Sequence, residues 1–169
     1  MPSAGFVLDR FQLEAIASLD NGRSVLVAAP TGSGKTVIAD AAVDIALHAG
    51  GKAFYTTPIK ALSNQKYSDL VARLGVENVG LLTGDTTVNG DAPVVVMTTE
   101  VLRNMLYAGS STLDTLHVVV LDEVHYLQDA YRGPVWEEII VGLPLNVRLV
   151  CLSATISNAS ELGAWIETV

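Results

Sequence analysis

The sequence predicts an α/β domain in which a mostly parallel sheet has helices on both faces, and three observations support this fold class. The chain has 169 residues, close to the ~150 residues of a typical domain, so we expect one domain spanning residues 1–169. Half of the residues are hydrophobic, which excludes a disordered chain. Short apolar runs alternate with stretches of helical spacing, which favours parallel strands joined by right-handed helical crossovers.

Six apolar runs are the predicted strands. Four of them lack any alternation of apolar and polar residues, which indicates strands buried on both faces, and two are shorter. In chain order the six runs are Val25 to Ala29, Ala53 to Tyr55, Val79 to Leu82, Val94 to Met97, Val118 to Leu121 and Leu149 to Leu152. The segment from Thr83 to Pro93 contains two Gly, three Asp or Asn and one Pro, so it is predicted to be a surface loop.

Four segments between or beside these runs have helical spacing. Asp9 is a candidate N-cap for the first, and Pro134 lies near the start of the fourth. Glycines at 50 and 51 and at 75 are expected to stop the second and third. The predicted apolar faces, in chain order, are Leu13, Ile16 and Leu19; Val37, Ala41, Ile45 and Ala46; Leu62, Tyr67, Leu70 and Leu74; and Trp136, Ile139 and Ile140.

Charge and cysteine content exclude several functional classes. Asp plus Glu number 18 and Lys plus Arg 10, giving a net charge of −8, which disfavours nucleic-acid binding mainly by phosphate neutralisation. The single cysteine, Cys151, excludes an internal disulfide and a Cys-rich zinc site. No apolar run reaches the ~18 residues of a membrane span, and the first residues do not resemble a signal peptide. We therefore expect a cytoplasmic protein with no membrane partner.

A glycine-rich segment follows the first predicted strand and opens the second predicted helix. Its sequence is Ala29-Pro30-Thr31-Gly32-Ser33-Gly34-Lys35-Thr36. It matches the phosphate-loop pattern G-x-x-x-x-G-K-[ST], except that alanine replaces the first glycine. The glycines let backbone N–H groups curl around phosphates, the lysine reaches the β and γ phosphates, and the threonine offers its hydroxyl to Mg²⁺. An ordinary glycine-rich turn is the alternative, but the order of strand, loop, Lys-Thr and helix favours nucleotide binding.

Two carboxylates, Asp122 and Glu123, end the most apolar predicted strand. Asp122 suits an outer contact to an Mg²⁺ held by Thr36, and Glu123 suits a base or an orienter for the attacking water. A capped helix start is the alternative for these two residues taken alone. Open parallel sheets bind ligands beyond the carboxyl ends of their strands, where the phosphate loop also lies. We therefore expect Lys35, Asp122 and Glu123 to be catalytic and Thr36 with Asp122 to hold the metal.

Together these segments resemble the first RecA-like domain of a superfamily 2 helicase, a P-loop NTPase fold. Lys35 and Thr36 match motif I, while Asp122-Glu123-Val124-His125 is a DExH version of motif II. The remaining matches are Pro58 to Lys66 with motif Ia, Thr83 to Asp85 with the motif after it, Thr98 to Arg103 with motif Ib, and Ser153 to Thr155 with motif III. Asp129 and the segment Arg132 to Glu138 are similar to a signature of the exosome-associated superkiller-type RNA helicases.

The resemblance implies ATP and Mg²⁺ as cofactors and a single strand of RNA or DNA as partner. It places Phe6 and Gln12 against adenine, beside the phosphate-loop residues Thr31, Gly32, Ser33 and Gly34. It implies a coupling role for His125, which would face a second RecA-like domain, and for Ser153 and Thr155 of motif III. The positions expected to contact the nucleic-acid backbone are Pro58, Lys60, Thr83, Gly84, Asp85, Thr99 and Glu100.

Two departures from the family pattern affect what we expect of the protein's source and of its ATP hydrolysis. Close eukaryotic relatives carry Ser-Ala where this chain has Gly32-Ser33, which points to a bacterial member and leaves an exosome-type nuclease partner open. The chain reaches Val169 without motifs IV to VI, so we expect a second RecA-like domain of the same polypeptide to supply the arginines of hydrolysis. An arginine finger is worth about 10³ to 10⁵ in turnover, so this chain alone should hydrolyse ATP slowly.

The predicted function is therefore the ATP-binding part of an ATP-dependent RNA helicase, with two alternatives. A DNA helicase of the same superfamily is one, because the matched motifs contact the backbone and do not separate RNA from DNA. A non-catalytic, nucleotide-dependent binding module is the other. The intact Lys35, Asp122 and Glu123 argue against such a decayed site.

Overall fold

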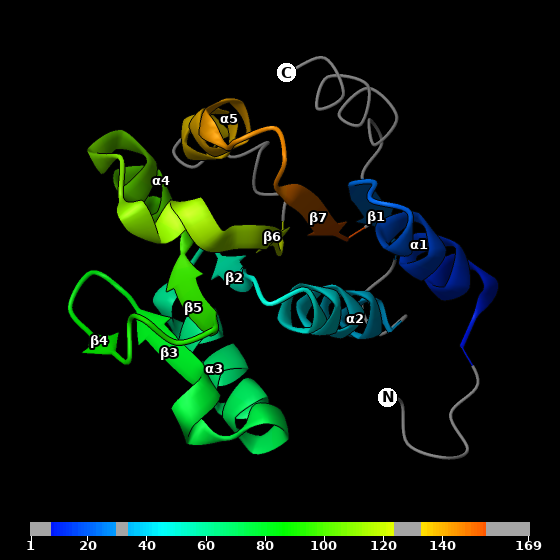
Figure 1. The fold of residues 1–169 in the computed structure, drawn as a ribbon, viewed down its shortest axis with the longest axis horizontal. Helices are drawn as coiled ribbons and strands as arrows, with labels where there is room; N and C mark the ends of the chain where they lie inside the picture. The colour runs from blue at the N-terminus through cyan, green and yellow to red at the C-terminus, as the bar shows by residue number, and fades with distance from the viewer. Residues whose placement is uncertain (1–7, 30–33, 124–132, 155–169) are drawn as a thin grey trace.

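The computed structural model describes residues 8–29, 34–123 and 133–154, and its centre is one seven-stranded sheet (Figure 1). The strand order across the sheet is β1-β7-β6-β2-β5-β3-β4. Every neighbouring pair is parallel except β3 with β4, which confirms the predicted mostly parallel sheet. The strands are β1 (Val25–Ala28), β2 (Lys52–Thr57), β3 (Val79–Leu82), β4 (Thr87–Val88), β5 (Val94–Thr98), β6 (Leu116–Leu121) and β7 (Arg148–Ser153).

Helices cover both faces of this sheet. Three pack on one face, α1 (Arg10–Asp20), α2 (Lys35–His48) and α3 (Lys60–Leu74), and two on the other, α4 (Thr99–Ala108) and α5 (Gly133–Gly142) (Figure 1). The two apolar cores follow from the period of two along a strand: Val118 and Val120 of β6 join the first core, whereas Val119 and Leu121 join the second. The predicted α/β fold class is therefore confirmed.

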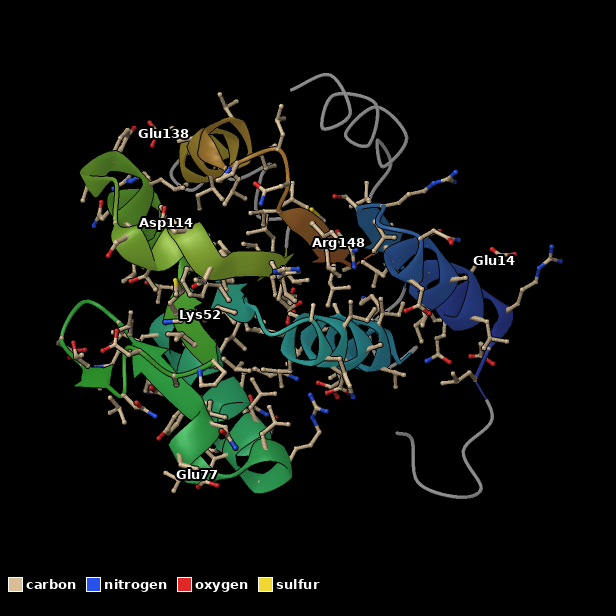
Figure 2. All side chains as sticks on the ribbon, in the orientation of Figure 1. Glu14, Lys52, Glu77, Asp114, Glu138 and Arg148 are labelled. Atoms are coloured by element: carbon tan, nitrogen blue, oxygen red, sulfur yellow. The ribbon has the colours of Figure 1, made fainter. Side chains whose placement is uncertain are left out.

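The charged side chains of Glu14, Glu77 and Glu138 lie at the periphery of these layers (Figure 2). Two short 3₁₀ turns, η1 (Val76–Asn78) and η2 (Ser111–Thr115), connect the helices to the strands that follow them. Among the described helices, none is both long and apolar enough to cross a membrane.

The apolar faces predicted for the helices are partly wrong. In α1, Leu19 is buried but Leu13 is 54 % exposed. The core face of α2 is Ile38, Ala39, Ala42, Val43 and Ala46, of which only the last was predicted. Because α2 is apolar on nearly every side, its spacing alone could not select the stripe that faces the sheet. In the fourth helix, Ile139 and Ile140 are buried as predicted, and the Trp136 side chain is outside the described part.

Helix α3 departs furthest from the predicted pattern. Of its predicted face only Leu70 is fully buried, and the other buried positions are the polar residues Ser63 and Lys66. Ser63 shares a hydrogen bond of 2.6 Å with Thr57, and Lys66 pairs with Asp40 of α2 at 3.5 Å. Polar partners therefore make these two burials possible, and a search for apolar spacing could not detect them.

The segment predicted as a surface loop, Thr83 to Pro93, contains strand β4, which pairs antiparallel with β3. The pairing requires glycine at position 80, because a Cβ there would lie 2.1 Å from the Asn89 carbonyl oxygen. Two Gly and one Pro favoured a loop interpretation over so short a strand. Helix α4, from Thr99 to Ala108, was not predicted as a helix either, since its segment was interpreted only as motif Ib, from Thr98 to Arg103.

Candidate nucleotide site

The carboxyl ends of β1, β7 and β6 are neighbours in the sheet, and a cavity of about 360 Å³ lies beyond β6 and β7. Segments far apart in the sequence line it: the start of α2, the residues after β6 and the end of β7. Six predicted site residues are among the lining, namely Gly34, Lys35, Thr36, Asp122, Glu123 and Ser153, together with Leu152 and Ala154. The structure thus brings the phosphate-loop end and the Asp-Glu pair to one cavity.

The start of α2 combines a glycine turn, a helix N-terminus and an ammonium group. Gly34 is the N-cap residue with φ of +90°, a left-handed conformation that favours glycine. The first N–H groups of a helix have no partner within it and carry its positive dipole end, which suits an anion. The Lys35 Nζ donates a hydrogen bond of 2.5 Å to the carbonyl oxygen of Ala29, at the other end of the loop.

Gln12 joins α1 to the end of the phosphate loop. Its side chain is 1 % exposed, its Oε1 accepts a hydrogen bond of 2.7 Å from the Asp9 N–H, and its Nε2 donates one of 2.9 Å to the Gly34 carbonyl. Asp9 is the N-cap of α1, as predicted. A Cβ on Gly34 would lie 2.6 Å from the Gln12 Nε2, a second reason for glycine there. The contact with adenine stays a prediction.

The Asp122 carboxylate is held by two donors. Its Oδ1 accepts a hydrogen bond of 2.8 Å from the Glu123 N–H, and its Oδ2 accepts one of 2.5 Å from the Tyr55 hydroxyl. The backbone N–H of Asp122 also donates to the Thr56 carbonyl at 3.0 Å. Burial, and after it the Asp122 charge, raises the pKa of Tyr55 well above its ordinary value, so the phenol remains a donor.

Tyr55 was missed as a site residue by the sequence reasoning, which treated it only as the end of a predicted strand. A signal existed, because a buried tyrosine hydroxyl in an apolar strand needs a hydrogen-bond partner. The identity of that partner depends on the pairing of β2 with β6, which the sequence does not contain.

Glu123 takes the left-handed conformation, with φ of +59°. For a residue with a Cβ this conformation costs about 1 kcal/mol, and such strain concentrates at functional sites. This residue follows β6 closely and lines the cavity.

The end of β7 contacts the start of the phosphate loop. The Ala29 N–H donates a hydrogen bond of 3.2 Å to the Ser153 carbonyl, and the Ser153 hydroxyl donates one of 2.6 Å to the Ala154 carbonyl. Ser153 is 1 % exposed. The motif III segment is therefore placed beside the motif I segment, and its coupling role stays a prediction.

The predicted nucleic-acid positions follow three neighbouring strands, β2, β5 and β3. Lys60 begins α3 and forms an ion pair of 2.5 Å with Asp85, whose Oδ1 also accepts a hydrogen bond of 3.1 Å from the Thr83 hydroxyl. The hydrogen bond from Lys60 lowers the pKa of Asp85. The structure therefore brings Lys60, Thr83 and Asp85 together. Of the remaining positions Pro58 and Thr99 are buried, while Gly84 and Glu100 are exposed.

Six predicted site residues lie outside the described residues, and their roles stay predictions: Phe6, Thr31, Gly32, Ser33, His125 and Thr155.

The donor set that is described fits a nucleotide with Mg²⁺. The cavity offers an ammonium group and a helix N-terminus for phosphates, and the Thr36 hydroxyl and Asp122 carboxylate for a metal. Within residues 8–29, 34–123 and 133–154, no three His, Cys, Asp or Glu side chains gather to hold a metal ion. A hydroxyl and a carboxylate suit Mg²⁺, which keeps several waters and takes one or two carboxylates plus phosphate oxygens.

Comparisons with known proteins agree with this geometry. The chain is 65 % identical over 164 residues to the probable helicase HelY of Mycobacterium leprae, covering 97 % of this chain and 18 % of that protein. It is 52 % identical over 161 residues to the human exosome RNA helicase MTR4, covering 95 % of this chain and 15 % of that protein. The chain thus spans less than a fifth of either relative.

A solved structure shares the fold. The crystal structure of the DUF1998 helicase MrfA bound to DNA and AMPPNP matches with a TM-score of 0.79 and 26 % identity, over 95 % of this chain and 26 % of that one. The higher identity to the mycobacterial helicase agrees with the bacterial membership that Gly32-Ser33 predicts. The family model for the DEAD/DEAH box helicase matches residues 9–162. The chain, with its RecA-like sheet, belongs to the DEAD/DEAH box helicase family.

Proposed function

We propose that this chain is the ATP-binding domain of an ATP-dependent RNA helicase and that its cavity binds ATP with Mg²⁺. One observation carries the proposal: the start of α2 and the residues after β6, distant in sequence, line the same cavity of about 360 Å³. A phosphate-binding turn and a carboxylate pair in one cavity are the parts that phosphoryl transfer requires.

Each lining residue has a role in this proposal. Lys35 exchanges its bond to the Ala29 carbonyl for the β and γ phosphates, a charge-assisted contact. Thr36 and Asp122 hold the metal, which when bound neutralises phosphate charge. Glu123 accepts a proton from, or orients, the attacking water. A second RecA-like domain would close over the cavity and supply arginines for the developing charge.

RNA is the proposed substrate because the human relative at 52 % identity is named an exosome RNA helicase. DNA is the second candidate, favoured by the MrfA structure, which is named as bound to DNA. Competition between RNA and DNA strands of one sequence for the whole protein decides between them. A cytoplasmic location is also part of the proposal, whereas an exosome-type nuclease partner stays open.

The test of helicase function uses a polypeptide that joins this chain to a second RecA-like domain. Glu123→Gln should keep ATP affinity and abolish both RNA-stimulated hydrolysis and strand unwinding, because an amide cannot accept a proton as a carboxylate does. Release of phosphate and separation of a labelled duplex measure the two activities. Full turnover in the variant would contradict the role of Glu123, and an unmutated protein without ATP-dependent unwinding would contradict the helicase proposal.

A further inference from the structure

A buried tyrosine outside the helicase motifs contacts the metal-site carboxylate. Tyr55 lies on β2, is 1 % exposed and pairs in register with Val120 of the parallel strand β6. Side chains two residues apart on a strand share one face, so Asp122, just beyond β6, lies on the side of the sheet that Tyr55 occupies. The Tyr55 hydroxyl reaches across and donates to Asp122 Oδ2 at 2.5 Å.

The ring of Tyr55 is also contacted by a residue of α3. The Lys66 Nζ lies 4.8 Å from the ring centroid, within range of a cation–π interaction. Lys66 is itself 9 % exposed and is anchored by the Asp40 carboxylate, whose Oδ1 lies 3.5 Å from its Nζ. Arg73 holds the same oxygen at 3.7 Å. The phenol therefore lies between the sheet and α3, and these contacts restrict the direction in which its hydroxyl can donate.

These contacts restrict the orientation of the Asp122 carboxylate. The Glu123 N–H fixes Oδ1 and Tyr55 fixes Oδ2, so the two donors together stop the carboxylate from rotating. Removing the phenol hydroxyl leaves one donor, so the carboxylate can rotate more freely. Binding a cation must then order the carboxylate, and the entropy lost in this step weakens cation binding. Groups that orient a metal-binding carboxylate in this way typically change metal affinity by about 10-fold to 100-fold when they are removed.

We propose that Tyr55 is a positioning residue for the metal site, which holds the Asp122 carboxylate in the orientation that meets Mg²⁺. The inference rests on the proposed function, because it assumes that the cavity binds a nucleotide with Mg²⁺. A purely structural role, in which Asp122 merely satisfies a buried hydroxyl, is the competing explanation.

The experiment measures ADP binding to this chain by calorimetry over a series of Mg²⁺ concentrations and in EDTA. Tyr55→Phe keeps the ring and removes only the hydroxyl. We expect unchanged ADP affinity in EDTA and a Mg²⁺ concentration for half-maximal enhancement raised about 10-fold. Thr56→Val is the matched control, since it removes the neighbouring buried hydroxyl, which donates to the Val120 carbonyl at 3.0 Å and does not contact the Asp122 carboxylate. Its Mg²⁺ dependence should equal that of the parent chain.

A double substitution asks whether Tyr55 acts through Asp122. In an Asp122→Asn background, Tyr55→Phe should produce no further change in Mg²⁺ dependence, because the group that it orients has lost its charge. A shift that persists in that background, or an equal shift in Thr56→Val, would overturn the positioning role. If Tyr55→Phe does not fold, Lys66→Met removes the contact of α3 with the ring. An unaltered Mg²⁺ dependence in Lys66→Met would then also overturn the positioning role.

The two proposals fail in different ways. A parent chain that binds no ADP with or without Mg²⁺ contradicts the proposed function itself. A parent chain that binds ADP with Mg²⁺ enhancement, beside a Tyr55→Phe variant with the same enhancement, contradicts only the role of Tyr55.

Discussion

Gln12 shows how one buried amide can tie a helix start to a binding loop. It accepts from the Asp9 N–H and donates to the Gly34 carbonyl. Gln12→Ala should lower the free energy of unfolding by about 1 to 3 kcal/mol, because the Asp9 N–H and the Gly34 carbonyl both lose their hydrogen-bond partner. Urea denaturation measures the change.

Leu13→Ala is the control for this substitution, since Leu13 lies next on the same helix and is 54 % exposed. It should change stability by about 0.5 kcal/mol or less. Equal effects of the two substitutions would mean that Gln12 is an ordinary helix residue.

The residues that line the cavity were largely predictable because nucleotide chemistry restricts their types and spacing. Gly34, Lys35 and Thr36 stand at fixed separations, and the Asp-Glu pair ends an apolar strand. The carboxyl-edge rule for parallel sheets then joined the two segments without any knowledge of strand order. The support around them was not predictable, since Tyr55 meets Asp122 only through the pairing of β2 with β6.

At the scale of elements, strands were easier to locate than helix faces. Both faces of a central parallel strand are buried, so the strand is visible as an unbroken apolar run, as in β6. A helix face is defined by its contacts, and α2 offers apolar residues on several sides. Helix α3 instead buries Ser63 and Lys66 by giving them polar partners, which no apolar period can detect.

Strand β4, at the edge of the sheet, was not predicted either, and the reason is physical. Strand β4 has two residues, both exposed, and in the described part of the chain it pairs only with β3. Edge strands are often short, and turn-forming residues around them outweigh so weak a strand signal.

At the scale of the whole molecule, charge limits how the chain can hold nucleic acid. The net charge is −8, and Lys60, the one lysine among the predicted backbone contacts, is already paired with Asp85. We therefore expect weak binding of single-stranded RNA through hydroxyl and N–H donors. Each phosphate neutralised contributes about −0.7 to the slope of log affinity against log salt, so even two cationic contacts should give a slope no steeper than about −1.4.

Fluorescence anisotropy of a labelled RNA strand over a salt series measures that slope. Lys60→Gln should remove at most one such contribution, about 0.7 in slope. Tight binding by this chain with a slope steeper than about −3 would show that a basic surface dominates recognition.

The central claim, that the cavity beside Lys35 binds ATP, is tested most directly by calorimetry of ATP binding to the parent chain and to Lys35→Ala. The ammonium group makes charge-assisted hydrogen bonds to phosphate, so the account predicts that the variant loses about 2 to 3 kcal/mol of binding free energy. Equal affinities for ATP in the two proteins, each with the thermal stability of a folded chain, would contradict it.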